Sequence, residues 1–197
     1  MKAPIIIFLA VLFQYSCGNA INPLIAPLAR ETGISEVQAG LFFTISSLMW
    51  LVASPYWGKQ SQWLGRKRVM LIGLGSCSIL YMLFAYIANW GLTHHISATL
   101  LFILLLITRI ISGLFFSTVP IAAQAYIADT TQGRERTSAL TLVWMGSGLG
   151  SIVGPSLGVI FNKELMTPLY LASFLPLFAF ALVWFLLPSS ENMTLQK

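Results

Sequence analysis

One arginine, Arg109, stands inside a long apolar stretch, LLLITRIISGLFFS. A guanidinium near the centre of a bilayer costs about 3 kcal/mol on insertion scales, so such a residue usually has a function. It could bind an anion in a water-filled cavity, support a network of carbonyl groups or adjust the acidity of a neighbouring carboxyl group. The alternative is a structural tie to backbone carbonyls or to side chains such as Asn19 or Asn22. Gln124, further along the same stretch, is another candidate for the lining of a cavity.

The first apolar stretch carries polar side chains at a regular spacing. Tyr15, Asn19 and Asn22 are separated by four and then three residues, so they share one face of a helix. Pro23 and Pro27 follow, and each lacks a backbone donor, so we expect the outer part of this helix to be broken. A polar face beside a broken helix is typical of a binding cavity between membrane helices.

The composition indicates that these elements lie in lipid. Of the 197 residues, 57% are hydrophobic and only 9% are charged, and the mean hydropathy is +0.81. These values exclude an ordinary soluble domain. At roughly 20 apolar residues per span, the length suits an all-α integral membrane protein of about six helices. The chain then divides into a six-helix domain over 1–188 and a polar tail over 189–197, with spans at 4–28, 37–57, 69–90, 97–127, 138–161 and 167–187.

The positive charges predict the orientation of these spans. The connections are short, so consecutive helices run antiparallel and the connections alternate between the two sides. With a cytoplasmic N-terminus, the outer side receives only Arg30 and Lys163. This bias predicts that both termini are cytoplasmic, and it explains the net charge of +5 without a nucleic-acid partner. The residues then expected on the cytoplasmic side are Lys2, Lys59, Arg66, Lys67, Arg68, Arg134, Arg136 and Lys197.

The connection after the second stretch, GKQSQWLGRK, has a pattern beyond its charge. Gly58 and Gly65 stand seven residues apart, and Arg66 and Lys67 follow directly. The pattern resembles the signature G-x-L-a-D-r-x-G-r-k of the major facilitator superfamily, with Gln62 in place of the aspartate. The resemblance implies a gating loop that closes the cytoplasmic face. Glutamine still forms hydrogen bonds but loses their charge-assisted part, a difference of about 1 kcal/mol.

The fourth stretch carries a second motif of the same family. Arg109 and Gly113 match its R-x3-G pattern, and Asp129 and Arg136 fall at the expected positions around the following cytoplasmic connection. These charges offer another latch for the gate, in which Arg66 or Arg136 pairs with Asp129.

The fifth stretch carries a third motif, GSGLGSIVGPSLGV. It resembles the G-x3-G-x3-G-P-x2-G motif of antiporters in the drug-export branch, with Val159 in place of the final glycine. Glycines four residues apart form a stripe along which a neighbouring backbone can approach closely. A proline after the stripe loosens the helix and allows a bend. The residues of this packing and hinge motif are Gly146, Gly150, Gly154, Pro155 and Gly158.

Three motifs in the family's order make the chain resemble the N-terminal half of such a transporter. The resemblance implies a fold of two three-helix repeats. It also implies a transporter that moves a small molecule by alternating access, with proton-coupled efflux of a drug-like compound or metabolite. It implies no cofactor or metal besides a proton gradient as the energy source, and no enzymatic activity. The implied partners are the lipid bilayer, the substrate and a second six-helix half, and the implied location is the bacterial inner membrane.

The size leaves three possibilities open. Family members have twelve helices in two halves, and this chain supplies one half. It is a fragment of a longer transporter, a half that pairs with a separately encoded half, or a homodimer.

The carboxylates leave proton coupling open. Proton pathways usually use a titratable acid within the membrane. Here Glu31 and Glu36 flank the outer connection, and Asp129 and Glu135 flank an inner one. We therefore expect the coupling carboxylate to come from elsewhere, or Asp129 or Glu36 to be buried.

Two other classes of protein are to be compared with a transporter. A membrane-embedded serine protease would need a base for Ser147, but Met145 breaks the Gly-x-Ser-Gly pattern and the histidines His94 and His95 fall in an outer connection. A non-transporting membrane subunit remains the alternative to a transporter.

Overall fold

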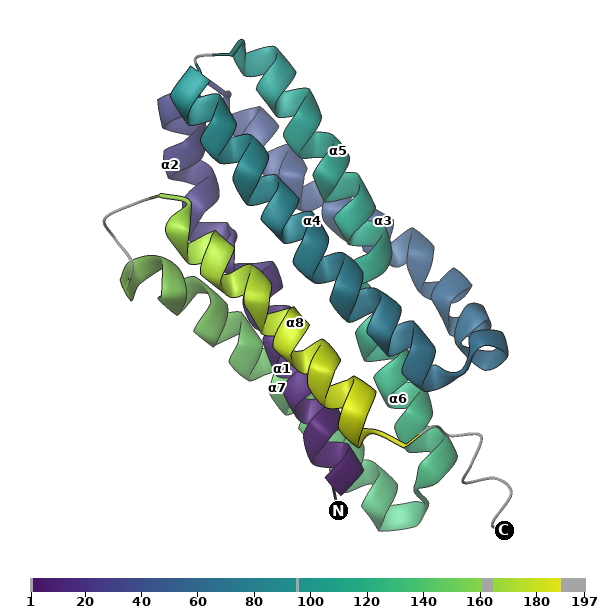
Figure 1. Cartoon of the computed structure of the whole chain (residues 1–197). Helices are drawn as coiled ribbons and strands as arrows, with labels where there is room; N and C mark the ends of the chain where they lie inside the picture. The colour runs from purple at the N-terminus through teal and green to yellow at the C-terminus, as the bar shows by residue number, and fades with distance from the viewer. Residues whose placement is uncertain (1, 95, 161–164, 189–197) are drawn as a thin grey trace.

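The computed structural model describes residues 2–94, 96–160 and 165–188, and the expected tail at 189–197 lies outside them. Its described residues form helices and contain no strand, and six helical spans are long and apolar enough to cross a membrane. The predicted all-α, six-span fold is thereby confirmed (Figure 1). The helices are α1 (Lys2–Ala20), α2 (Asn22–Thr32), α3 (Glu36–Leu64), α4 (Arg66–His94), α5 (Ala98–Phe116), α6 (Thr118–Thr130), α7 (Gly133–Ile160) and α8 (Thr167–Leu186).

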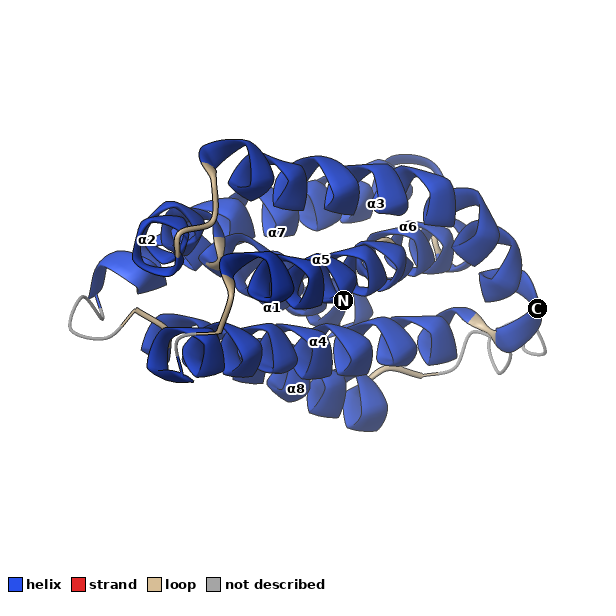
Figure 2. Ribbon diagram, turned by 90° about the horizontal axis from the view of Figure 1, so that it is seen from above, coloured by secondary structure: helices blue, strands red, loops and turns tan. Residues whose placement is uncertain are grey.

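The helices pack in layers, seen from above in Figure 2. α4 and α8 lie on one side of α1 and α5, and α3 and α7 lie on the other. α1 packs against α7 and α8, and α5 packs against α3 and α4. α3 and α7 are the least buried of the spans. The bundle is therefore well covered on the α4 and α8 side and open on the α3 and α7 side.

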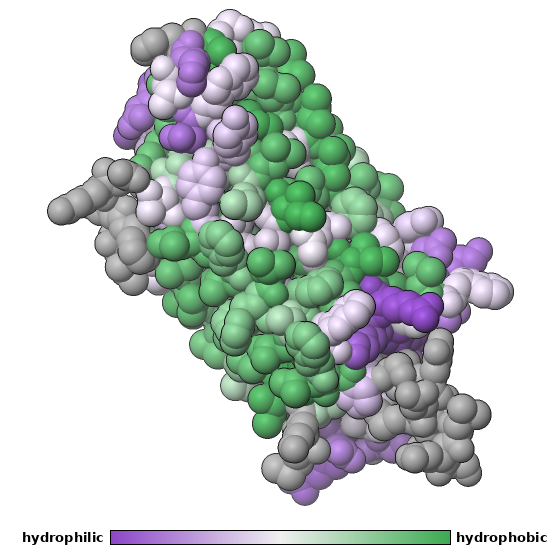
Figure 3. Space-filling view, in the orientation of Figure 1, coloured by the Kyte–Doolittle hydropathy of each residue, from purple (hydrophilic) through white to green (hydrophobic). Residues whose placement is uncertain are grey.

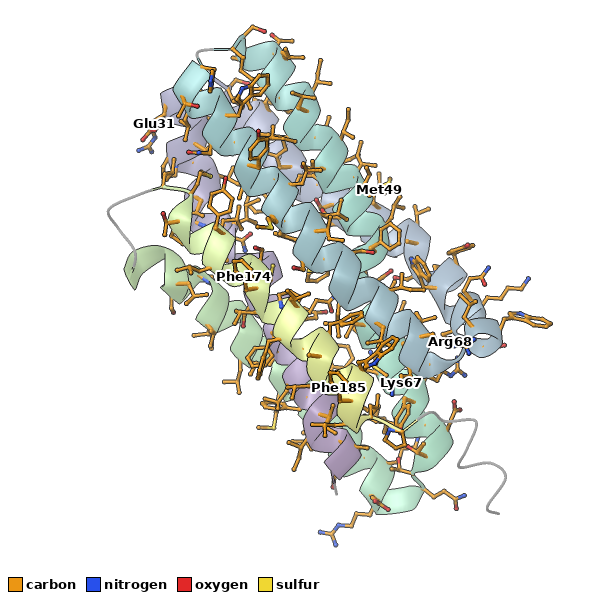
Figure 4. The ribbon with its side chains drawn as sticks, viewed as in Figure 1. Glu31, Met49, Lys67, Arg68, Phe174 and Phe185 are labelled. Atoms are coloured by element: carbon orange, nitrogen blue, oxygen red, sulfur yellow. The ribbon has the colours of Figure 1, made fainter. Side chains whose placement is uncertain are left out.

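Polar residues gather at the two ends of the bundle. Figure 3 shows an apolar surface between two polar ends, as expected for a bundle whose axis crosses a bilayer. Glu31 lies at one end, whereas Lys67 and Arg68 lie at the other, where α1 begins and α8 ends (Figure 4). Phe174 and Phe185 are exposed along α8, on the apolar surface. The connections thus alternate between the two ends, as the sequence predicts.

The first span is broken directly before the first of its two prolines. α1 ends at Ala20 and α2 begins at Asn22, so the break precedes Pro23. Pro23 lies in the first turn of α2, where its missing N–H has no partner to lose. Pro27 lies inside α2 and does not end it. The span is thus interrupted at Pro23, as expected from the sequence, whereas Pro27 does not interrupt it and α2 continues to Thr32.

The fourth span is broken in the same way, between Phe116 and Thr118. A break frees backbone carbonyls that need donors within the membrane. Trp57 donates its indole N–H to the carbonyl of Leu114 at 2.7 Å, and Gln14 donates its amide to the carbonyl of Phe116 at 3.1 Å. The first and fourth spans begin the two three-helix repeats, so the break recurs at the same place in each repeat.

The expected loop at 58–67 is also wrong. α3 continues to Leu64 and α4 begins at Arg66, so only Gly65 separates the two helices. The polar residues after Trp57 mark the edge of the apolar region, but they are acceptable helix formers and the helix continues past it. Gly65 has a φ of 86°, a conformation that a residue with a side chain rarely adopts. The gate motif is therefore a tight helix–helix corner.

Candidate functional site

A cavity of about 330 Å³ opens on the poorly covered side of the bundle. α3 and α7 flank it, α1, α2 and α5 form its floor, and Tyr81 of α4 reaches it from below. Four sequence candidates line this cavity: Tyr15, Asn19, Asn22 and Arg109. Gln124 is not among the lining residues and lies half-buried on α6.

Arg109 is held on the floor of the cavity by two neutral partners. Its exposed fraction is 6%. Its Nε donates to the backbone carbonyl of Phe42 at 3.3 Å, and its Nη1 donates to the hydroxyl of Tyr81 at 3.2 Å. The guanidinium carbon also lies 5.9 Å from the centre of the Tyr81 ring. The tie to a carbonyl and the position in a cavity therefore occur together, and the tie does not involve Asn19 or Asn22.

A close contact between α3 and α5 fixes the height of Arg109. The hydroxyl of Ser46 lies 3.3 Å from the carbonyl oxygen of Arg109 and 2.8 Å from that of Phe42, and its single proton is shared between the two. One turn later, a Cβ on Gly113 would lie 2.6 Å from the carbonyl oxygen of Ser46. The glycine of the R-x3-G motif thus lets the two backbones meet where the arginine enters the cavity.

Amide side chains connect α2, α1 and α7 along the cavity. Asn22 donates to the side-chain oxygen of Asn19 at 3.0 Å. Asn19 in turn donates to the carbonyl of Tyr15 at 2.9 Å and lies 3.4 Å from the hydroxyl of Ser151. These groups are neutral, and Asn22 and Ser151 remain exposed toward the cavity. They provide both donors and acceptors to a bound molecule.

The glycine stripe of α7 lies against the backbone of α1. A Cβ would lie 2.9 Å from the carbonyl oxygen of Phe8 at Gly146 and 2.7 Å from that of Leu12 at Gly150. At Gly154 it would lie 2.4 Å from the carbonyl oxygen of Ser16. Pro155 lies inside α7, which continues past it, and the surroundings of Gly158 lie outside the described residues.

An ion pair joins the gate motif to the end of the fourth span. Arg66 Nε lies 2.9 Å from Asp129 Oδ2, and a second nitrogen of Arg66 donates to the hydroxyl of Ser61. Lys67 donates to the carbonyl of Trp184 at the end of α8, at 2.8 Å.

The other residues that the sequence predicts for a gate lie around this corner. Gly58 is half-buried within α3, and Gln62 is exposed one turn later. Arg136 is exposed in the first turn of α7. Of the two latches considered from the sequence, the described structure contains the pair of Arg66 with Asp129.

Sequence reasoning missed the partners of Arg109. Tyr81 is a polar side chain near the middle of the third span, and its depth could have marked it as a candidate. The carbonyl of Phe42 carries no signal in the sequence. The hydroxyl of Ser147 donates to the carbonyl of Trp144 at 2.8 Å, whereas His94 contacts Thr93 at the end of α4, so the described contacts do not form a serine–histidine pair.

A bundle of six apolar spans with a partly polar cavity on one side is typical of an integral membrane protein of the transporter type. A profile of the Major Facilitator Superfamily matches residues 7–196, so the chain belongs to this family, as the motifs predicted. The chain is 32% identical to the tetracycline resistance protein, class B, of Escherichia coli, over 87% of this chain and 41% of that protein. It is 27% identical to multidrug resistance protein 2 of Bacillus subtilis (strain 168), over 98% of this chain and 46% of that protein.

A solved structure has the same fold. The human organic anion transporter MFSD10 (TETRAN) superposes with a TM-score of 0.74 at 20% identity, over 95% of this chain and 47% of that one. This chain spans about half the length of the solved structure and of the curated relatives that it matches.

Proposed function

We propose that this chain forms the N-terminal half of a secondary transporter that exports a drug-like compound or metabolite by alternating access. The observation that carries the proposal is the half-open cavity with a buried arginine and neutral polar groups, placed among apolar spans. Relatives named for tetracycline and multidrug resistance support export as the direction. A proton gradient is the proposed energy source, and no catalytic step is assigned to the chain.

The proposed partner is a second six-helix half that covers the open side between α3 and α7. The lengths of the relatives support it, because each has about as much chain again beyond the matched region. The second half is covalently linked, separately encoded or a second copy of this chain. The proposed location is the bacterial inner membrane, with the Gly65 corner and both termini cytoplasmic, because the positive charges gather at that end.

Alternating access also needs a cytoplasmic latch, for which we propose the pair of Arg66 and Asp129. Their side chains are 15% and 44% exposed, so the coupling energy should be only about 0.5–1 kcal/mol and should fall as salt rises. Thermal unfolding of Arg66→Gln, Asp129→Asn and the double variant measures this coupling energy.

Transport lost in Arg66→Asp should return in part when Asp129→Arg is added. A cycle of Asp129→Asn with Arg136→Gln is the control, and an equal coupling there would remove Arg66 as the specific partner.

The function is tested by efflux of a lipophilic fluorescent dye from energised cells that express the chain. Dye loss that disappears with a proton uncoupler and in Arg109→Ala is the expected result. Membrane insertion is verified in parallel, so that failed expression is not mistaken for inactivity. If the inserted protein exports no dye, neither when expressed alone nor when co-expressed with the second half of a relative, the result would favour a non-transporting subunit.

A further inference from the structure

The charge of Arg109 has no counter-charge in the described part of the chain. The carboxylates there lie at helix ends: Glu31, Glu36, Asp129 and Glu135. Asp129 is already paired with Arg66. Arg109 itself contacts a backbone carbonyl and a phenol hydroxyl, both neutral. A buried cation without an anion is costly, so this floor of the cavity favours an anionic oxygen.

The remaining lining of the cavity does not repel an anion. The amide groups of Asn19 and Asn22 and the hydroxyl of Ser151 are neutral. Asn22 has a second amide N–H beyond the one that it donates to Asn19, so it can donate to an anion, whereas the hydroxyl of Ser151 already donates to the carbonyl of Ser147 at 2.9 Å. An anion that approaches Arg109 therefore meets no carboxylate from α1, α2, α3, α4, α5 or α7 among the cavity's lining residues.

The same cavity is rich in aromatic rings. Phe43 and Trp50 of α3 are 38% and 37% exposed, and both line it. Phe116 of α5 faces them from the floor, with the Tyr15 ring edge-on at a centroid distance of 5.2 Å. Aromatic side chains bind planar apolar bodies through large contact areas and favourable ring geometry.

We propose, on the basis of the function above, that the substrates are aromatic organic anions. The anionic oxygen, a carboxylate, phenolate or enolate, accepts hydrogen bonds from the guanidinium of Arg109, and the aromatic body packs on Phe43, Trp50 and Phe116. A carboxylate side chain from the second half would supply the same anionic oxygen, and the binding experiment below, performed with and without a co-expressed second half of a relative, separates these two sources.

Equilibrium binding to the purified protein in detergent is the test, with three ligands that share one ring system. The probes are radiolabelled 1-naphthoate as the anion, 1-naphthamide as the neutral analogue and 1-naphthylmethylammonium as the cation. The expected result is at least tenfold tighter binding of the anion than of the amide, with the cation weakest. Equal binding of all three would overturn the proposal, since it would mean that a protein carboxylate already neutralises Arg109.

A charge placed in the cavity tests the same inference without disturbing the contacts of Arg109. Asn22→Asp keeps the size of an exposed side chain, so the fold should be retained. It should weaken the binding of 1-naphthoate at least tenfold and strengthen the binding of 1-naphthylmethylammonium. Asn89→Asp, at an exposed position of α4 away from the cavity, is the matched control and should leave both affinities unchanged. Equal effects of the two variants would overturn the proposal.

Transport is measured separately, in proteoliposomes. Selective binding of 1-naphthoate without dye or naphthoate transport would keep the anion site and reject the transport function. Dye export without preference for the anion would keep the transport function and reject the substrate class.

Discussion

Replacement of Gly154 by alanine is expected to lower the free energy of unfolding by about 1–3 kcal/mol, the usual cost of overpacking a close contact. The added Cβ would lie 2.4 Å from the carbonyl oxygen of Ser16 and 2.9 Å from the backbone nitrogen of Ala20. Both neighbours are backbone atoms of α1, so neither can rotate away. The helices must separate instead, and the packing along the whole stripe weakens.

The matched control is Gly148→Ala on the same helix. A Cβ there would meet no atom within 4 Å. Its expected effect is neutral or slightly stabilising, because alanine is the better helix former. Unfolding is followed in detergent by a thiol-reactive dye, which reads Cys17 and Cys77, both buried in the fold. Similar melting temperatures for the two alanine variants would contradict the close packing of α7 on α1.

The sequence alone was sufficient for the spans and for the residues that share a helix face. In lipid, an apolar stretch of bilayer length can pair all its backbone N–H and C=O groups within itself only as a helix, so the six spans follow from composition and length. The spacing of Tyr15, Asn19 and Asn22 places them on one face of any α-helix, and the structure places all three along the cavity. The family was predicted because glycines and charges at fixed spacings survive as motifs.

The contacts between helices could not be read from the sequence. A membrane helix is apolar on nearly every face, so its pattern does not say which side meets a neighbour. Arg109 has two partners, the hydroxyl of Tyr81 and the carbonyl of Phe42. Which groups it meets depends on how each helix is rotated about its own axis. Gln124 lies on α6, beyond the break at Ser117, and is not among the residues that line the cavity. Polar residues around Gly58 indicated the edge of the membrane, but not the end of α3.

Substitution of Arg109 by glutamine is expected to abolish transport while it leaves the fold intact. The two groups that lose Arg109 each keep another hydrogen-bond partner. The carbonyl of Phe42 still accepts from Ser46 at 2.8 Å, and the hydroxyl of Tyr81 still donates to the carbonyl of Gly18 at 3.5 Å. The substitution also removes a membrane-buried charge, which costs about 3 kcal/mol on insertion scales. We therefore expect the free energy of unfolding to change by less than about 1 kcal/mol, or to rise.

Dye efflux and thermal unfolding, measured on the same preparations, separate the two roles of Arg109. Arg134→Gln is the control, since it removes an equal charge from an exposed position in the first turn of α7 and should change neither property. Arg109→Lys should retain part of the transport, because it keeps the charge but loses the planar fork that reaches Phe42 and Tyr81 together. A fall in melting temperature of many degrees in Arg109→Gln would instead make the arginine a structural tie between α3, α4 and α5. Retained stability with lost efflux would mean that Arg109 serves transport rather than the fold.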